Sequence, residues 1–310
     1  MVRRGLILAL VFACSGEGVF GQNATSAEER VAQTPRARGA AVGGTIGDVE
    51  RLAPASAGDP DIGEQVLLQP AATYEAFSAW SNWNYLWTSN PDLLDDTSES
   101  DGLLTGSLGG SFLPYLGKNL FGEFSAEQSI YRYADRTDLD FDALSLTAGL
   151  IYVVRDLGDL TLFTNYNYDL LTDRAWNGEI FHSHTITAGA RKVFAITRGQ
   201  RAYTSFSADF NVGGWPDYAL RHNFSWLTGY QANLTRSLTL DLYYQISAQA
   251  YLYDDRADLN QLIGGGLTYG ITEWLSVQTT ASLGINSSTE EFYDYFAANL
   301  GGGIGVLINF

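Results

Sequence analysis

The three histidines are the first residues of this sequence whose side chains could perform chemistry. His182 and His184 lie two positions apart, so on a β-strand both would point to one face, as a pair of metal ligands requires. Ser183 stands between them and would point to the opposite face. Neither His184 nor His222 is followed two residues later by a serine, so no Ser–His pair for hydrolysis shares a face. We therefore expect no catalytic residue, no metal site and no cofactor, and a lipid hydrolase is the least favoured alternative.

Clustered acidic residues are the second candidate. The chain carries 35 Asp and Glu against 18 Lys and Arg, a net charge of -17. Together the clusters could form a negative vestibule that concentrates cations or binds divalent ions, or they could simply keep exposed loops solvated. In either case the charge disfavours a nucleic-acid partner. The clusters are Asp92, Asp95, Asp96, Glu99 and Asp101; Asp135, Asp138, Asp140 and Asp142; Asp254, Asp255 and Asp258; and Glu290, Glu291 and Asp294.

A third set of charges lies within the segments expected to form strands, at positions expected to face inward. Acids exceed bases in this set, so a water-filled path lined by these side chains would favour cations. Mutual neutralisation is the alternative, for example between Arg221 and Asp209 on neighbouring strands. The expected lumen-lining charges are Glu123, Glu127, Asp169, Arg191, Asp209, Arg221 and Asp241.

Alternating segments must position all of these side chains. In 238–252 every even position from Leu238 to Leu252 is apolar or aromatic, whereas the odd positions are polar or tyrosine. A period of two places the two sets on opposite faces of a strand. Such a run is also longer than a typical soluble strand, while a tilted membrane strand needs about 9–11 residues.

Twelve such segments follow one another, separated by turn signals. Short connections, such as 117–119 and 235–237, alternate with longer or more polar ones, such as 89–102 and 254–260; 215–218 is a short exception. An even strand count and this alternation of connections are typical of a transmembrane antiparallel up-and-down β-barrel. The expected strands are 74–88, 103–116, 120–134, 141–156, 160–173, 181–196, 202–215, 219–234, 238–253, 261–272, 275–287 and 296–310.

The composition fits the same all-β class. Charged residues make up 17% of the chain and aromatic residues 13%, with a mean hydropathy of -0.07. A barrel accounts for such a chain because only alternate residues of each strand face lipid. A β-sandwich is the structural alternative, but its strands usually run only about 5–6 residues. In this barrel the three histidines would lie on the lipid-facing side, near the membrane rim.

The N-terminal region does not alternate. Residues 1–21 combine Arg3 and Arg4 with a short apolar run and a cleavage site ending at Gly21, as in a signal peptide. Processing at Cys14, the only cysteine, as a lipoprotein is the alternative. We expect 22–72 to be a flexible periplasmic arm, or a short plug around 63–69, and 73–310 to be the barrel.

The last residues alternate and end on an aromatic side chain. Ile304, Val306, Ile308 and Phe310 resemble the C-terminal signal of bacterial outer-membrane β-barrel proteins. This resemblance covers the broad class over 74–310 and identifies no functional family or oligomeric state. It implies the outer membrane as the location, with its lipid and the barrel-assembly machinery as partners. The alternation of short and longer connections then predicts that both termini lie in the periplasm.

The leading functional interpretation is a passive, cation-biased pore or narrow channel for small cationic or neutral solutes. It rests on a polar lumen, acidic loops and the lack of a catalytic constellation, so the protein is not expected to be an enzyme. The alternative is a closed structural or surface-interaction barrel that binds partners through its acidic extracellular loops.

Overall fold

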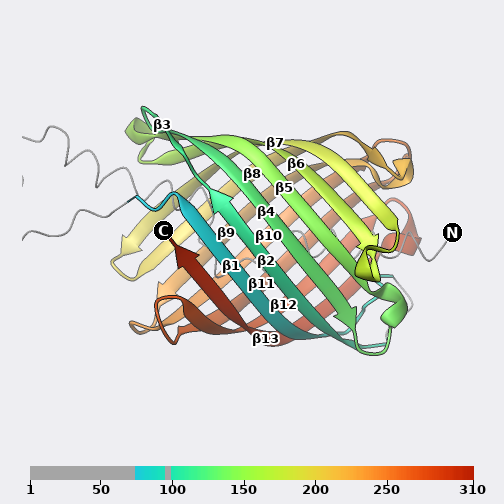
Figure 1. The fold of residues 1–310 in the computed structure, drawn as a ribbon. Coiled ribbons are helices and arrows are strands. Elements are labelled where there is room, and N and C mark those ends of the chain that lie inside the picture. Colours follow the sequence, from blue (N-terminus) through green and yellow to red (C-terminus); the bar gives the residue numbers. More distant parts are fainter. Residues whose placement is uncertain (1–73, 95–98) are drawn as a thin grey trace, which may run out of the picture.

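The computed structural model describes residues 74–94 and 99–310, and these fold into one closed antiparallel β-barrel (Figure 1). The expected signal peptide, the arm at 22–72 and the lipoprotein alternative at Cys14 lie outside the described residues. Asp95 and Asp96 lie outside them as well. None of the helical turns within the described residues is long or apolar enough to cross a membrane as a helix.

The barrel wall has twelve strand positions around its circumference, as the sequence predicts. Each strand pairs with its neighbours in sequence, and β1 closes the barrel by pairing with β13 from Ser78↔Asn309 to Thr88↔Asn299. β2 and β3 occupy one strand position in turn, because both pair with β4. The strands are β1 (Phe77–Thr88), β2 (Asp101–Phe112), β3 (Tyr115–Gly117), β4 (Leu120–Tyr133), β5 (Phe141–Val154), β6 (Leu160–Asp173), β7 (Glu179–Thr197), β8 (Gln200–Trp215), β9 (Arg221–Asn233), β10 (Leu238–Tyr251), β11 (Ala257–Gly270), β12 (Leu275–Ser288) and β13 (Tyr295–Asn309). Short 3-10 turns are η1 (Thr137–Leu139), η2 (Arg155–Leu157), η3 (Arg174–Trp176), η4 (Asp217–Ala219) and η5 (Glu291–Tyr293).

The two ends of the barrel differ. We call the end where β1 begins and β13 ends the turn end, and the opposite end the loop end. In Figure 1 the C-terminus lies at the turn end, beside the start of β1. Connections at the loop end span 89–100, 134–140, 174–178, 216–220, 252–256 and 289–294, and those at the turn end span 118–119, 155–159, 198–199, 234–237 and 271–274.

The asymmetry of the connections is smaller than the sequence suggested, because several strands that start at the loop end begin earlier than expected. β7 begins at Glu179 rather than 181, and β11 begins at Ala257 rather than 261. The expected loop at 254–260 is therefore wrong in its second half. Asp258 belongs to β11, where the neighbouring Arg256 neutralises its carboxylate and lets a strand accommodate the charge.

Side chains alternate between the two faces of the wall, and this alternation follows the predicted one. On β10, Leu242 is 47% exposed on the outer face, whereas the next residue, Tyr243, is 4% exposed on the inner face. Exposed large apolar side chains, such as Trp83, Tyr85 and Trp87 of β1, occupy the outer face around the barrel. The outer surface is thus matched to lipid, as the alternation requires.

The interior is not uniformly polar, which the sequence did not predict. At the loop end, buried apolar side chains form the loop-end core: Leu86, Leu93, Leu103, Tyr133, Leu139, Phe141, Leu171, Ile180, Phe181, Ala219, Leu220 and Ala297. At the turn end a smaller group consists of Leu113, Phe121, Ile151 and Val153, with Tyr74 and Phe163 packed against it. Some polar residues of the interior therefore lie between the two apolar groups, and others lie beside them at the ends of the barrel.

One glycine allows a tryptophan to lie across the inner wall. A Cβ on Gly109 of β2 would come within 2.5 Å of the ring of Trp80, which extends from β1 over this position. The Trp80 indole N–H then reaches Glu127 on β4, the strand beyond, and donates to its Oε2 at 2.5 Å. The absence of a side chain at Gly109 thus leaves the space that the Trp80 ring occupies.

We predict that Gly109→Ala lowers the free energy of unfolding by about 1–3 kcal/mol, because the added methyl overpacks the Trp80 ring. Urea-induced unfolding followed by tryptophan fluorescence measures this. Gly284→Ala on β12 is the matched control, since a Cβ there meets its nearest neighbours at 3.9 Å. Equal stability of the two variants would contradict the packing of Trp80 over Gly109.

Candidate functional site

A row of polar side chains crosses the inner wall between the two apolar groups. Cross-strand pairing places Glu127 of β4 opposite Ser145 of β5, and Ser145 opposite Asp169 of β6. Glu127 accepts hydrogen bonds from Trp80 and, at 3.2 Å, from the Ser129 hydroxyl. The Ser145 hydroxyl donates to Asp169 at 2.7 Å. Two carboxylates two strands apart, roughly 10 Å, are thus held on the same face of the wall.

A hydrogen-bonded chain of side chains continues around the barrel. The Thr147 hydroxyl contacts Asn167 at 3.0 Å, and the Asn167 amide donates to Thr187 at 2.9 Å. Thr187 and Asn223 each donate to the carboxylate of Asp209, both at 2.8 Å. Glu127, Asp169 and Asp209 are only partly buried, so the interior between the apolar groups contains surface that water can reach. We call the row and this chain together the polar belt.

The structure places all seven predicted lumen-lining charges on the inward-facing register of their strands, and their role there stays a prediction. Glu123 is buried, and Asp241 accepts a hydrogen bond from the Tyr203 hydroxyl at 3.0 Å. The Arg191 guanidinium lies 5.3 Å from the centre of the same tyrosine ring. Asp241 and Arg191 thus share one aromatic neighbour on the inner wall, Tyr203.

Two further interior residues were not found from the sequence. Arg201 faces inward and donates to Gln231 on β9, but it stood one residue before the expected start of its strand at 202. A strand start at Gln200 would have included it. Trp80 gives no sequence signal of its own, because tryptophan in a barrel strand is common at the lipid-facing interfaces.

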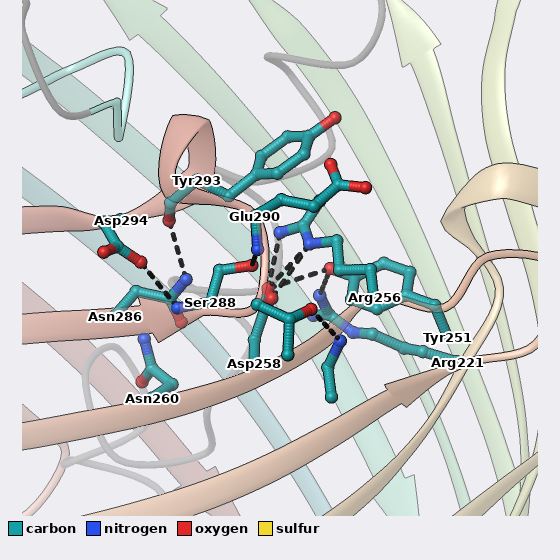
Figure 2. Close-up of polar contacts among 12 residues, drawn as sticks. Arg221, Tyr251, Arg256, Asp258, Asn260, Asn286, Ser288, Glu290, Tyr293 and Asp294 are labelled. Atoms are coloured by element: carbon teal, nitrogen blue, oxygen red, sulfur yellow. Dashed lines mark hydrogen bonds and ion pairs between the residues drawn. The ribbon is translucent and has the colours of Figure 1, made fainter.

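Four side chains at the loop end form a stack of alternating arginines and tyrosines, which we call the Arg–Tyr cluster (Figure 2). The Arg256 guanidinium lies 3.3 Å from the ring centre of Tyr293 and 4.3 Å from that of Tyr251. Arg221 lies 5.5 Å from the Tyr251 ring centre and donates to its hydroxyl at 2.7 Å. These residues come from β9, the end of β10, the loop before β11 and η5.

Asp258 anchors the Arg–Tyr cluster. Its carboxylate accepts from Arg256 Nε at 2.9 Å, and the two side chains are only 2% and 11% exposed. Burial by itself would lower the pKa of Arg256, but the hydrogen bond and charge of Asp258 outweigh it and raise the pKa above its ordinary value. The adjoining 289–294 loop is fixed separately, with the Ser288 N–H donating to Asp294 at 2.6 Å. The cluster is therefore a fixed part of the loop end.

Several of the clustered acidic residues bind neighbouring groups instead of forming a free vestibule. Asp101 accepts hydrogen bonds from the N–H groups of Gly102, Asp135 and Arg136. Asp92 pairs with the Arg136 side chain, and this hydrogen bond raises the pKa of Arg136.

Two more acids of the second cluster act in the same way. Asp142 pairs with Arg132, and Asp140 pairs with Arg174 at 3.3 Å. Both carboxylates are buried. Asp138 is exposed and lies 3.3 Å from Arg136, and the other exposed members of the clusters include Glu99, Asp254, Asp255, Glu290 and Glu291. The loop end therefore carries less unpaired negative charge than the sequence suggests.

The histidines lie on the outer face. His182 contacts Glu179 through Nδ1, and His184 Nδ1 lies 2.6 Å from the Tyr166 hydroxyl. Ser183 is buried on the inner face, so it is separated from both imidazoles by the wall. Within residues 74–94 and 99–310, no group of three or more His, Cys, Asp or Glu side chains is arranged to hold a metal ion.

Comparison with solved structures identifies the class of fold. An outer membrane channel from Pseudomonas putida F1 aligns with a TM-score of 0.52 and 12% identity, over 76% of this chain and 96% of that chain. An anion-selective porin from Comamonas acidovorans aligns with a TM-score of 0.40 and 10% identity, over 75% and 98% of the two chains. Outer membrane phospholipase A from Escherichia coli gives 0.43 and 14%, over 78% and 94%. No protein-family model matches the sequence, and no curated protein matches it significantly.

The chain has the closed twelve-stranded β-barrel fold of the outer membrane channel in the first of these alignments. At these identities the likeness concerns the fold alone.

We predict that Asp258→Asn destabilises the loop end by about 3 kcal/mol, because it leaves the buried Arg256 charge without its partner. Limited proteolysis within 252–256, together with denaturant unfolding, measures the effect. Asp254→Asn removes an exposed carboxylate from the same loop and serves as the control. If both variants resist protease equally, the Arg256–Asp258 pair does not hold this loop.

Proposed function

We propose that this protein is a passive channel that lets small polar solutes cross the outer membrane and favours cations over anions. The observation that carries the proposal is the polar belt, whose partly exposed carboxylates and hydroxyls face the barrel interior. Polar groups enclosed by a barrel are stabilised by water or by one another, and the belt retains water-accessible surface. The solutes that this lining suits are small cations and neutral molecules rich in hydroxyl groups.

The orientation in the membrane follows from the connections. Outer-membrane barrels have short periplasmic turns and longer extracellular loops. The longest connection, 89–100, lies at the loop end, which supports an orientation with the loop end outward and both termini on the periplasmic side. Outer-membrane lipid and the barrel-assembly machinery are the partners that this topology and the terminal Ile304–Phe310 segment imply.

The route through the loop end lies on one side of the barrel. The loop-end core draws its buried side chains from β1, β2, β4 to β7, β13 and three loop-end connections, and β8 to β12 contribute none of them. The Arg–Tyr cluster occupies the side that the core leaves uncovered. A solute would therefore pass beside β10 to β13, next to Arg221 and Tyr251.

The cation preference rests on the inward-facing charges. Glu123, Glu127, Asp169, Asp209 and Asp241 face the interior together with Arg191, Arg201 and Arg221. An excess of carboxylates along a narrow path raises the local cation concentration. No hydrolytic step is proposed, because Ser183 and the histidines lie on opposite faces of the wall.

The test is single-channel recording of the full mature protein in a planar bilayer under a salt gradient. We expect a steady conductance and a reversal potential of the sign that cation preference gives. In the double variant Asp169→Asn and Asp209→Asn, the cation-to-anion permeability ratio should fall roughly fivefold, as about 1 kcal/mol of lost Coulomb energy implies.

The matched control is the double variant Asp254→Asn and Asp255→Asn, which removes two charges from an exposed loop. Its permeability ratio should change less than that of the belt variant, because exposed charges are screened by salt. A correctly folded barrel that passes no current would overturn the proposal in favour of a closed, partner-binding barrel. An anion-directed reversal potential would overturn the cation preference alone.

A further inference from the structure

A hollow of about 590 Å³ opens on the outer face of the barrel, across β5, β6 and β7. Its lining is unusual for a surface that faces lipid. Tyr166 and Tyr168 of β6 and Glu179, His182 and His184 of β7 contribute polar groups to it. Polar side chains on the lipid face of a barrel are costly away from the interfaces. A hollow lined by five of them is therefore a candidate binding site.

The polar groups of the hollow are arranged in two pairs. The carboxylate of Glu179 accepts from His182 Nδ1, since an ionised carboxylate can only accept. Tyr166 shares a hydrogen bond of 2.6 Å with His184 Nδ1. In both rings Nδ1 is therefore occupied, and Nε2 is the nitrogen left to meet a ligand. The ring centres lie 5.7 Å apart, so one small group could contact both Nε2 atoms.

The floor of the hollow is apolar. Leu146 and Ala148 of β5 line it, and both lie on the outward register of their strand. The Tyr168 ring lies 5.0 Å from the ring of His184 and extends the aromatic side of the hollow. A ligand that fills this space would combine an apolar chain against β5 with an anionic group against β7.

We propose that this hollow binds a membrane lipid that carries a phosphate, with the phosphate on His182 and His184 and an acyl chain along Leu146 and Ala148. The Tyr166 hydroxyl donates to His184 Nδ1, which places the imidazole proton on Nε2 as a donor. Glu179 holds His182 through Nδ1, so the Nε2 atom of that ring is left to face the same phosphate group. Charge-assisted hydrogen bonds of this kind are the strong ones in phosphate recognition.

The position of the hollow supports a lipid as the occupant. It lies on the outward face of a membrane barrel and near the loop end, since β7 begins at Glu179. Phosphates of lipid headgroups lie at the same boundary between water and hydrocarbon. This site is separate from the interior, so the proposal does not depend on whether the barrel conducts.

Native mass spectrometry of the full mature protein in detergent tests the proposal with three probes. Dioleoyl phosphatidic acid carries both parts of the ligand, dioleoylglycerol lacks the phosphate, and inorganic phosphate lacks the chains. We expect phosphatidic acid to bind at least about tenfold more tightly than either of the others, a difference of about 1.4 kcal/mol. Equal binding of inorganic phosphate would show a site for free phosphate, and equal binding of dioleoylglycerol an apolar groove only; either result overturns the proposal.

The double variant His182→Gln and His184→Gln should lose this preference for phosphatidic acid while the barrel stays folded. His222→Gln is the matched control, because His222 also faces outward, on β9, but lies outside the hollow and accepts from the Asn211 N–H. Heat-modifiable mobility on electrophoresis reports whether each variant retains the folded barrel. A folded double variant that binds phosphatidic acid as the parent does would overturn the assignment to these histidines.

Discussion

The backbone hydrogen bonds that join β1 to β13 are the interaction on which the rest of this structure depends. Phe77 and Phe310 exchange two of these bonds, each at 3.0 Å, and their rings stack with centres 6.3 Å apart. In hydrocarbon an open sheet edge leaves backbone groups unpaired, so a sheet is stable there only when it closes. The C-terminal residue therefore completes the ladder that the first strand begins, which gives the aromatic end of the sequence a structural role.

Closure also fixes what lies inside. Alternate side chains of every strand must face an enclosed space, and in this protein that space has three zones. Apolar groups occupy part of each end, while hydroxyls, amides and carboxylates satisfy one another in the polar belt between them. At the loop end, buried carboxylates such as Asp101 and Asp258 hold the connections in place. The same residues that give the chain its acidic character therefore also rigidify the loop end.

Much of the fold could be predicted because one physical signal, the period of two, recurs in every strand. It gave the strand count, and it placed Asp169 and Asp209 on the inner face and His182 on the outer face. It could not find the early start of β11, because the neutralisation of Asp258 by Arg256 depends on a contact rather than on alternation. It also missed the loop-end core, since a rule that assigns polar residues to the interior does not anticipate Leu86 or Phe141 there. The hollow on β5 to β7 depends on three strands packing side by side, which no single segment reveals.

The central claim is that water and small solutes occupy the interior on the side of β10 to β13. The most direct test is the single-channel current of Thr268→Cys, before and after a positively charged methanethiosulfonate reagent is added. Thr268 faces inward on β11, the adjacent Leu267 faces outward, and the sequence has no cysteine other than Cys14. We expect a stepwise loss of current in Thr268→Cys and no change in Leu267→Cys. A current that the reagent leaves unchanged in Thr268→Cys would contradict the claim.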